Sequence, residues 1–193
     1  MLKQYKPTLD KLTKIVGKSH VLIDEQDTRH YRQGIRFGEG KVLAVVCPGT
    51  LLEQWQALQT IIEADCVVIM QAANTGLTGG STPYGDEYDR PVIIMSTRRL
   101  QGIQVILDGK QVVCLPGATL DNLERTLKPY NREPHSVIGS SCIGASVLGG
   151  VCNNSGGALV RRGPAYTEMA LYARVNESGE LELINPRAKS FLC

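Results

Sequence analysis

The strongest constraint on the fold is a pair of short, continuously apolar runs, Val42–Cys47 and Cys66–Met70, which are separated by a helical pattern. Runs of this length that are rich in β-branched residues are typical of strands buried on both faces. Pro48-Gly49 ends the first run, and Thr50 with Glu53 three residues later has the pattern of a capping box at the start of a helix. We therefore expect a strand–helix–strand unit whose strands are parallel, neighbouring and joined right-handedly.

Further strands and helices are predicted after this unit. Pro91–Met95 is a third buried run, and two alternating stretches around Asp108-Gly109 predict a β-hairpin. Thr119 starts a helix that ends before Pro129, and a second hairpin is expected around residues 176–179. The predicted class is α/β or α+β with mixed sheets.

The first forty residues are more polar than the rest. Lys3–Val16 has the apolar spacing of a short helix, and Asp24 is placed to cap a second helix that runs to Gln33 and is ended by Gly34. Neither helix buries enough apolar surface to be stable alone, so we expect both to cover the elements that follow. This divides the chain into an N-terminal helical arm, residues 1–40, and a larger domain, residues 41–193.

Composition excludes several classes of protein. The 193 residues are 42% hydrophobic and 21% charged, with a net charge of +2, which does not favour a nucleic-acid partner. The apolar runs are too short to span a bilayer, and the first residues lack the apolar segment of a secretory signal. The six cysteines form no CxxC pair, so we expect no metal site and a reducing, cytoplasmic setting.

The first candidate site is AANTGLTGGS, residues 72–81, which follows a predicted buried strand. Ligands of open α/β sheets bind beside such strand ends, and glycine lets the backbone approach a ligand closely. The loop has no Lys or Arg, and it matches neither GxxxxGK[ST] nor GxGxxG. Successive backbone N–H groups form an anion-binding nest. The residues thus favour a neutral pyrophosphate cradle, or else a glycine-rich surface turn that binds nothing.

A second segment, residues 137–157 (VIGSSCIGASVLGGVCNNSGG), contains six glycines. By itself it fits a tightly packed turn and helix, and its GASVLGG stretch has P-loop spacing without the lysine. Small side chains along such a stretch also leave room for a large flat ligand that lies against the backbone. Two glycine-rich segments separated by strands therefore favour a shared ligand slot.

These two segments, together with the intervening LDGKQVVCLPGATLDNLERTL, resemble the FAD-binding domain of the vanillyl-alcohol oxidase/p-cresol methylhydroxylase flavoprotein family. The resemblance extends from about Leu9 onward. It implies an α+β fold of the p-cresol methylhydroxylase type, in which a strand–helix–strand subdomain accompanies a mixed or antiparallel sheet. It also implies that the first loop wraps the FAD pyrophosphate, whereas the second segment runs along the ribityl chain and the isoalloxazine ring.

Carried over by position, the resemblance assigns ten residues of this chain to FAD: Ala72, Ala73, Asn74, Thr75, Gly76, Gly80, Ser81, Gly139, Ser146 and Gly156. Some family members tether the flavin covalently through a histidine or cysteine, and the first loop contains neither. The three histidines, at positions 20, 30 and 135, lie in polar stretches. We therefore expect FAD to be bound noncovalently.

The stretch QAANTGLTGGSTP resembles in particular the family's bacterial respiratory enzymes, which oxidise D-lactate to pyruvate and pass the electrons through FAD to quinone. That implies a peripheral protein on the cytoplasmic side of the inner membrane, with its membrane contact outside this chain. Family members are longer, so the substrate-binding cap and the last strands of the FAD-binding domain are expected after position 193. No catalytic residue is assigned, and this chain alone is expected to be inactive. The alternatives are a family enzyme for another 2-hydroxy acid or alcohol, and a fragment without bound flavin.

Overall fold

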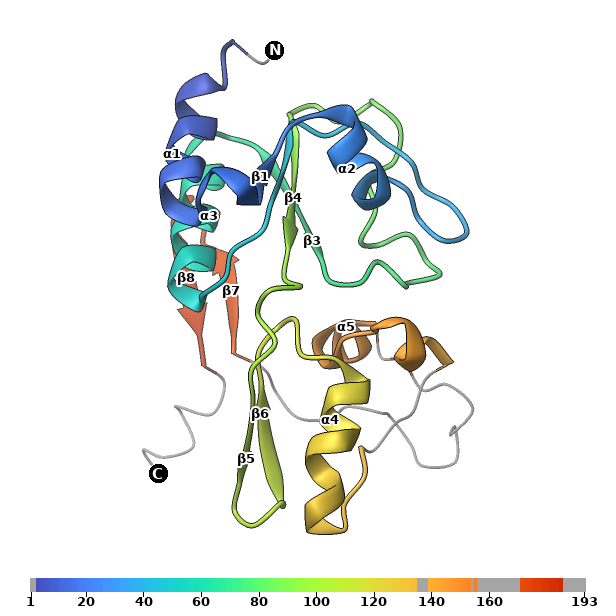
Figure 1. The fold of residues 1–193 in the computed structure, drawn as a ribbon. Coiled ribbons are helices and arrows are strands. Elements are labelled where there is room, and N and C mark those ends of the chain that lie inside the picture. Colours follow the sequence, from blue (N-terminus) through green and yellow to red (C-terminus); the bar gives the residue numbers. More distant parts are fainter. Residues whose placement is uncertain (1–2, 135–138, 154, 156–170, 186–193) are drawn as a thin grey trace.

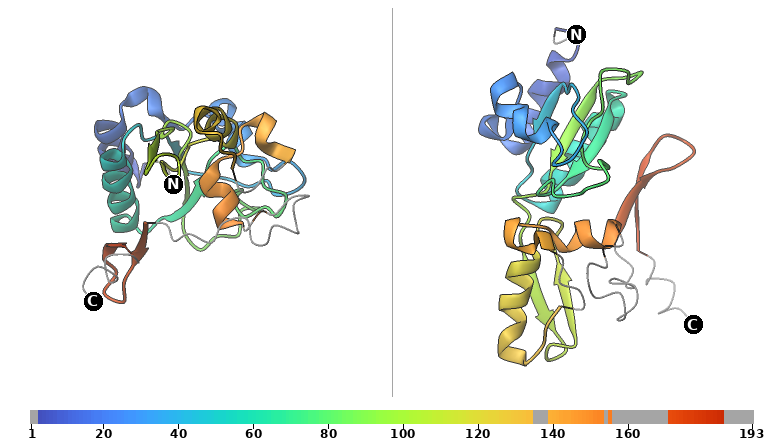
Figure 2. Two further views of the ribbon diagram at one scale, coloured as in Figure 1. Left: turned by 90° about the horizontal axis from the view of Figure 1, so that it is seen from below. Right: turned by 90° about the vertical axis from the view of Figure 1, so that its right-hand side faces the viewer.

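The structure is a computed structural model that describes residues 3–134, 139–153, 155 and 171–185. It has the predicted α+β architecture. Figure 1 shows a central sheet with helices α1 to α3 in one half and a hairpin with helix α4 in the other. Both figures place the short helix α5 between the two halves, close to the first glycine-rich loop, residues 72–81 (Figures 1 and 2).

The central sheet has four strands in the order β1-β2-β4-β3, with bounds Val21–Leu22, Ala44–Val46, Val92–Ser96 and Val67–Gln71 respectively. β4 is parallel to both β2 and β3, whereas β1 is antiparallel to β2. The expectation that β2 and β3 are neighbours is wrong, because Ile93 of β4 pairs with Ala44 on one side and Val68 on the other. Every residue of β4 is buried, so the central position removes the apolar side chains of this strand from water.

The two faces of the sheet carry alternate side chains, as a strand's period of two requires. Helices α1 (Lys6–Val16) and α3 (Leu51–Glu63) cover one face, where Leu12, Ile61 and Ile93 are fully buried. Val45 and Ile94 point to the opposite face, where Tyr31 of α2 (Glu25–Arg32) packs against them. The sheet is therefore buried between two helical layers, which explains its continuous apolar runs.

The predicted capping box at the start of α3 is confirmed. The hydroxyl of Thr50 accepts from the backbone N–H of Glu53 at 3.1 Å. The carboxylate of Glu53 reaches back to the N–H of Gly49 at 2.7 Å, one residue before the cap. This arrangement fixes the turn that leaves β2 and hence the start of the crossover to β3.

Both predicted hairpins are present in the chain after β4, one beside α4 and the other beside α3 (Figure 1). Strands β5 (Ile103–Ile106) and β6 (Gln111–Cys114) are joined by a four-residue turn, in which Asp108 and Gly109 have positive φ. β7 (Tyr172–Val175) and β8 (Leu181–Ile184) form the second antiparallel pair. Two further helices are α4 (Leu120–Leu127) and α5 (Val147–Cys152). The described residues also form three short 3₁₀ helices: η1 (Lys18–His20) between α1 and β1, η2 (Lys128–Tyr130) after α4, and η3 (Gly139–Ile143) before α5.

The N-terminal residues are part of the main core. Leu9, Leu12 and Val16 of α1 belong to the same buried cluster as β2 and β4. Strand β1, which the sequence did not predict, extends the sheet at the β2 edge. Among the described residues, no helix combines the length and the apolar character needed to cross a bilayer.

Replacing Leu12 by Ala tests how far this region supports the sheet. The side chain is fully buried, so the substitution should lower the free energy of unfolding by about 2–5 kcal/mol. Chemical denaturation followed by circular dichroism measures it. Lys14→Ala on the exposed side of the same helix is the matched control and should change stability little. A loss below about 1 kcal/mol for Leu12→Ala would contradict the packing.

Candidate functional site

The first glycine-rich loop lies at the carboxyl edge of the parallel strands. It leaves β3, and the neighbouring ends of β2 and β4 lie at the same edge because all three strands are parallel. Figure 1 shows the loop approaching α5 on one side and the segment that follows α2 on the other. Most of its residues are half-buried, with Leu77, Thr78 and Gly80 exposed. This edge is where open parallel sheets bind ligands.

Asn74 organises the interior of the loop. Its backbone is left-handed, with φ of 56°. Its side-chain carbonyl accepts hydrogen bonds from the hydroxyls of Ser81 at 2.9 Å and Thr82 at 3.0 Å, and its amide donates to the carbonyl of Gln33 at 2.8 Å. The Asn74 side chain is thus engaged within the protein, where it holds the loop in shape.

The backbone of the loop is open to a ligand. An added Cβ at Gly80 would meet no atom within 4 Å, and one at Gly76 would meet only the Ser81 hydroxyl, at 4.0 Å. Across the described part of the chain, the backbone N–H groups of residues 75–81 donate no hydrogen bond to another protein atom. Free amide donors beside empty space are what a neutral anion cradle requires, so the residues present fit a pyrophosphate.

The segment after α2 forms a wall for this loop. A Cβ added to Gly79, whose φ is 76°, would lie 3.0 Å from the ring of Phe37. Gly34 admits no side chain at all, because its added Cβ would lie 2.2 Å from the carbonyl of Phe37. This wall depends on residues 33–38, to which the sequence analysis gave no role beyond ending a helix.

The second glycine-rich segment meets the first. An added Cβ at Gly144 would lie 3.8 Å from the Cβ of Ala73, which is van der Waals contact. The segment is anchored by backbone bonds from Leu120 to Ala145, at 2.9 Å, and from Val147 to Ala118, at 2.8 Å. The structure therefore brings the two segments together, as a shared slot requires.

The remaining predicted residues of this segment have different surroundings. Ser146 is buried and caps α5, since its hydroxyl accepts from the N–H of Gly149 at 2.9 Å. Gly139 is the first residue of η3. Gly156 lies outside the described residues, so its predicted role has no structural counterpart here.

Two titratable groups near this edge, the half-buried Tyr31 and the buried Cys47, are neutral. The hydroxyl of Tyr31 lies 3.9 Å from the thiol of Cys47, and burial is the main cause that raises the pKa of each above its usual value. Both therefore stay protonated at pH 7. Arg99 contributes a cation at the end of β4, where its guanidinium donates to the carbonyl of Cys47 at 2.6 Å.

Sequence reasoning missed the residues that support the first loop, above all Gln71. This amide is 2% exposed at the end of β3. The sequence does contain a sign that Gln71 has a special role, because it is a polar residue that ends an otherwise apolar strand. What it contacts depends on the tertiary structure, which brings Tyr31 and Ser81 to it.

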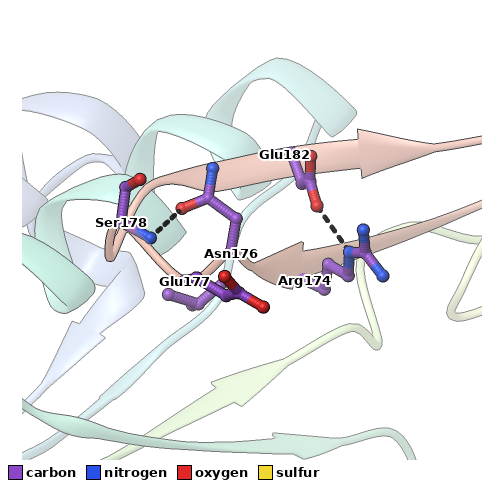
Figure 3. A pocket seen from close by; sticks show the side chains of 6 residues that line it. Arg174, Asn176, Glu177, Ser178 and Glu182 are labelled. Carbon is purple, nitrogen blue, oxygen red and sulfur yellow. Dashed lines mark hydrogen bonds and ion pairs between the residues drawn. The ribbon is translucent and has the colours of Figure 1, made fainter.

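A hollow lies beside the β7–β8 hairpin, and the contacts of its lining residues explain it. Figure 3 shows Arg174 paired with Glu182 across the strands, while Asn176 accepts from the backbone N–H of Ser178 within the turn. Hydrogen bonding to Glu182 is the main cause that raises the pKa of Arg174. These groups stabilise the hairpin. No three His, Cys, Asp or Glu side chains gather as metal ligands within the described ranges.

Comparison with known proteins supports the resemblance of the two segments. The profile of a family described as FAD binding domain matches residues 42–182. Two curated relatives are quinone-dependent D-lactate dehydrogenases: that of Haemophilus influenzae is 63% identical over 92% of this chain, and that of Escherichia coli K12 is 60% identical over 93%. The chain spans about a third of their length, 31% and 32%.

A solved structure supports the fold. p-Cresol methylhydroxylase with substrate bound superimposes with a TM-score of 0.69 at 16% identity, over 94% of this chain and 35% of that one. The family profile covers most of the sequence and includes the whole of the first loop. On these grounds the chain belongs to the family described as FAD binding domain, and it shares the fold of p-cresol methylhydroxylase.

Proposed function

We propose that the two glycine-rich segments hold FAD noncovalently. The observation that carries this proposal is the closeness of Ala73 and Gly144: a Cβ added to Gly144 would lie 3.8 Å from the Cβ of Ala73, so the two segments of small residues lie side by side. The proposed contacts are those carried over from the family: Ala72, Ala73, Asn74, Thr75, Gly76, Gly80, Ser81, Gly139, Ser146 and Gly156. The described part of the first loop offers no histidine or cysteine for a covalent bond.

The roles of these residues follow from their surroundings. Open backbone N–H groups at residues 75–81 would donate to the pyrophosphate, and the missing side chains of Gly76 and Gly80 would let it approach. Asn74 would keep the loop in shape through Gln33, Ser81 and Thr82. FAD, when bound, supplies the hydride-accepting chemistry, whereas this chain supplies position and electrostatics.

We further propose that the whole protein is a quinone-dependent D-lactate dehydrogenase, which oxidises D-lactate to pyruvate and passes the electrons to quinone. The support is that relatives with this description are 63% and 60% identical over nearly all of this chain. The residues that bind lactate are proposed to lie in the two thirds of the relatives' length that this chain does not match. We also propose attachment to the cytoplasmic face of the membrane through those parts, without a membrane-spanning segment.

We propose that residues 1–40 support the cofactor loop while residues 41–193 carry it. Gln33 and Phe37, which both contact the loop, come from the first region. One physical argument favours the alternative, an inert fragment. Contacts from the two thirds of the relatives that this chain does not match would add to the affinity for FAD, so this chain by itself would bind FAD more weakly.

Noncovalent binding predicts a retained and releasable flavin. The purified chain, mixed with FAD and freed of excess, should show the yellow flavin spectrum. Acid precipitation should then release all the flavin into the supernatant. A colourless protein would favour the inert fragment, and flavin that stays with the precipitate would contradict noncovalent binding.

Replacing Gly80 by Val tests the pyrophosphate position. The Cβ of the new side chain has no protein atom within 4 Å, so folding should be little affected, but the side chain fills the space assigned to the ligand. We expect the Kd for FAD to rise at least about tenfold, equivalent to about 1.4 kcal/mol. Flavin fluorescence quenching measures the Kd, and circular dichroism checks the fold. An unchanged Kd in a folded variant would remove Gly80 from the site.

The substrate is tested on the full-length protein. With a dye as electron acceptor, its kcat/KM for D-lactate should exceed that for L-lactate and for larger 2-hydroxy acids at least about tenfold, which corresponds to about 1.4 kcal/mol of transition-state stabilisation. A preference for another 2-hydroxy acid would retain the family and replace the substrate.

A further inference from the structure

The strongest feature without an assigned role is the buried amide of Gln71. Its Nε2 donates to the carbonyl of Ser81 at 2.6 Å and to the carbonyl of Tyr31 at 2.9 Å. A primary amide has two N–H groups, and here both are used. The side chain is 2% exposed, so no solvent can replace these partners readily.

These two acceptors give Gln71 control over the shape of the loop. Ser81 lies at the far end of the loop that begins directly after Gln71, so one bond sets the distance between entry and exit. Tyr31 lies in the last turn of α2, so the other bond ties the loop to a different layer of the fold. Gln71 is itself fixed, because its carbonyl accepts from the N–H of Thr97 at 2.8 Å.

A second bond links the same two parts of the structure. Asn74 donates to the carbonyl of Gln33, two residues beyond Tyr31, while it accepts from Ser81 within the loop. The loop is thus held by side-chain amides, whereas the backbone N–H groups of residues 75–81 make no bond within the described protein. Side chains of this kind define the loop's shape and leave its own donors unused.

We propose that Gln71 is a positioning residue for the FAD site: it closes the pyrophosphate loop onto the end of α2 and thereby aims the free N–H groups at the cofactor. This proposal rests on the FAD site proposed above and deepens it. Because the donors are arranged before the ligand arrives, binding would not have to order the loop. Loss of Gln71 should therefore weaken cofactor binding more than it weakens the fold.

Two substitutions separate these effects. Gln71→Glu keeps the shape but replaces the donating amide with a carboxylate that faces two carbonyl oxygens. Gln71→Met keeps the length and removes both donors. We expect either change to raise the Kd for FAD of the 193-residue chain at least about tenfold.

Controls distinguish positioning from general stability. Ile61→Val removes a methyl group from the core on α3, far along the chain from the loop, and should lower the melting temperature without changing the Kd for FAD. Gln104→Glu makes the same chemical change as Gln71→Glu at an exposed position of β5 and should change neither quantity. If the Gln71 variants change the Kd only as much as Ile61→Val does, the positioning role is overturned.

Amide hydrogen exchange provides a readout that does not require flavin. In the cofactor-free chain, Gln71→Glu should increase exchange at Thr82, whose N–H donates to Gly79 at 3.1 Å, and leave the core strands protected. Unchanged exchange at Thr82 would overturn the proposal even if the unsubstituted chain retains no FAD. A chain that retains no FAD would count against the proposed FAD site, whereas the exchange at Thr82 tests the role of Gln71 separately.

Discussion

A loop that offers its backbone donors to a ligand cannot use those donors to hold itself together. This constraint accounts for much of the structure around residues 72–81. The loop has almost no backbone hydrogen bonds of its own, and the amides of Gln71 and Asn74 replace them. Gln71 bonds to the last turn of α2 and Asn74 to the residue just after it, so the N-terminal forty residues are coupled to this loop through backbone carbonyls. Neutral side chains suffice, because they act on the protein and leave the ligand to the backbone.

The same logic explains the absence of charge in the first loop. The pyrophosphate proposed for this loop is held and not cleaved, so it would need directed donors more than a full positive charge, and open amides beside glycine would provide them. The second segment approaches the first closely, since Gly144 has no side chain and a Cβ added there would already lie 3.8 Å from the Cβ of Ala73. The half-buried phenol of Tyr31 and the buried thiol of Cys47 have raised pKa values and remain neutral, so they add no competing charge.

Local sequence patterns predicted the local structure well. The capping box at Thr50, the helix start at Thr119 and both hairpins depend on neighbouring residues, and the structure has all of them. The position of β4 between β2 and β3 was not predictable in this way, because adjacent strands in the chain usually pair. The support from Gln71 was missed for a similar reason: its partners are 10 and 40 residues away. The assignment of individual residues to FAD came from family resemblance, and the roles of Gly139 and Gly156 still depend on it.

The strand order has a consequence for how the protein is made. β2, α3 and β3 leave the ribosome before β4, yet neither β2 nor β3 has a parallel partner until Val92–Ser96 is available. The nascent chain therefore carries β3 without a partner, and β2 with only the short antiparallel β1, for the time it takes to synthesise the glycine-rich loop and the polar stretch after it. Pairings between distant residues form slowly, and exposed strand edges promote aggregation. Early association of α1 with α3 would shield one face of these strands during translation, which gives the N-terminal helix a use before the sheet exists.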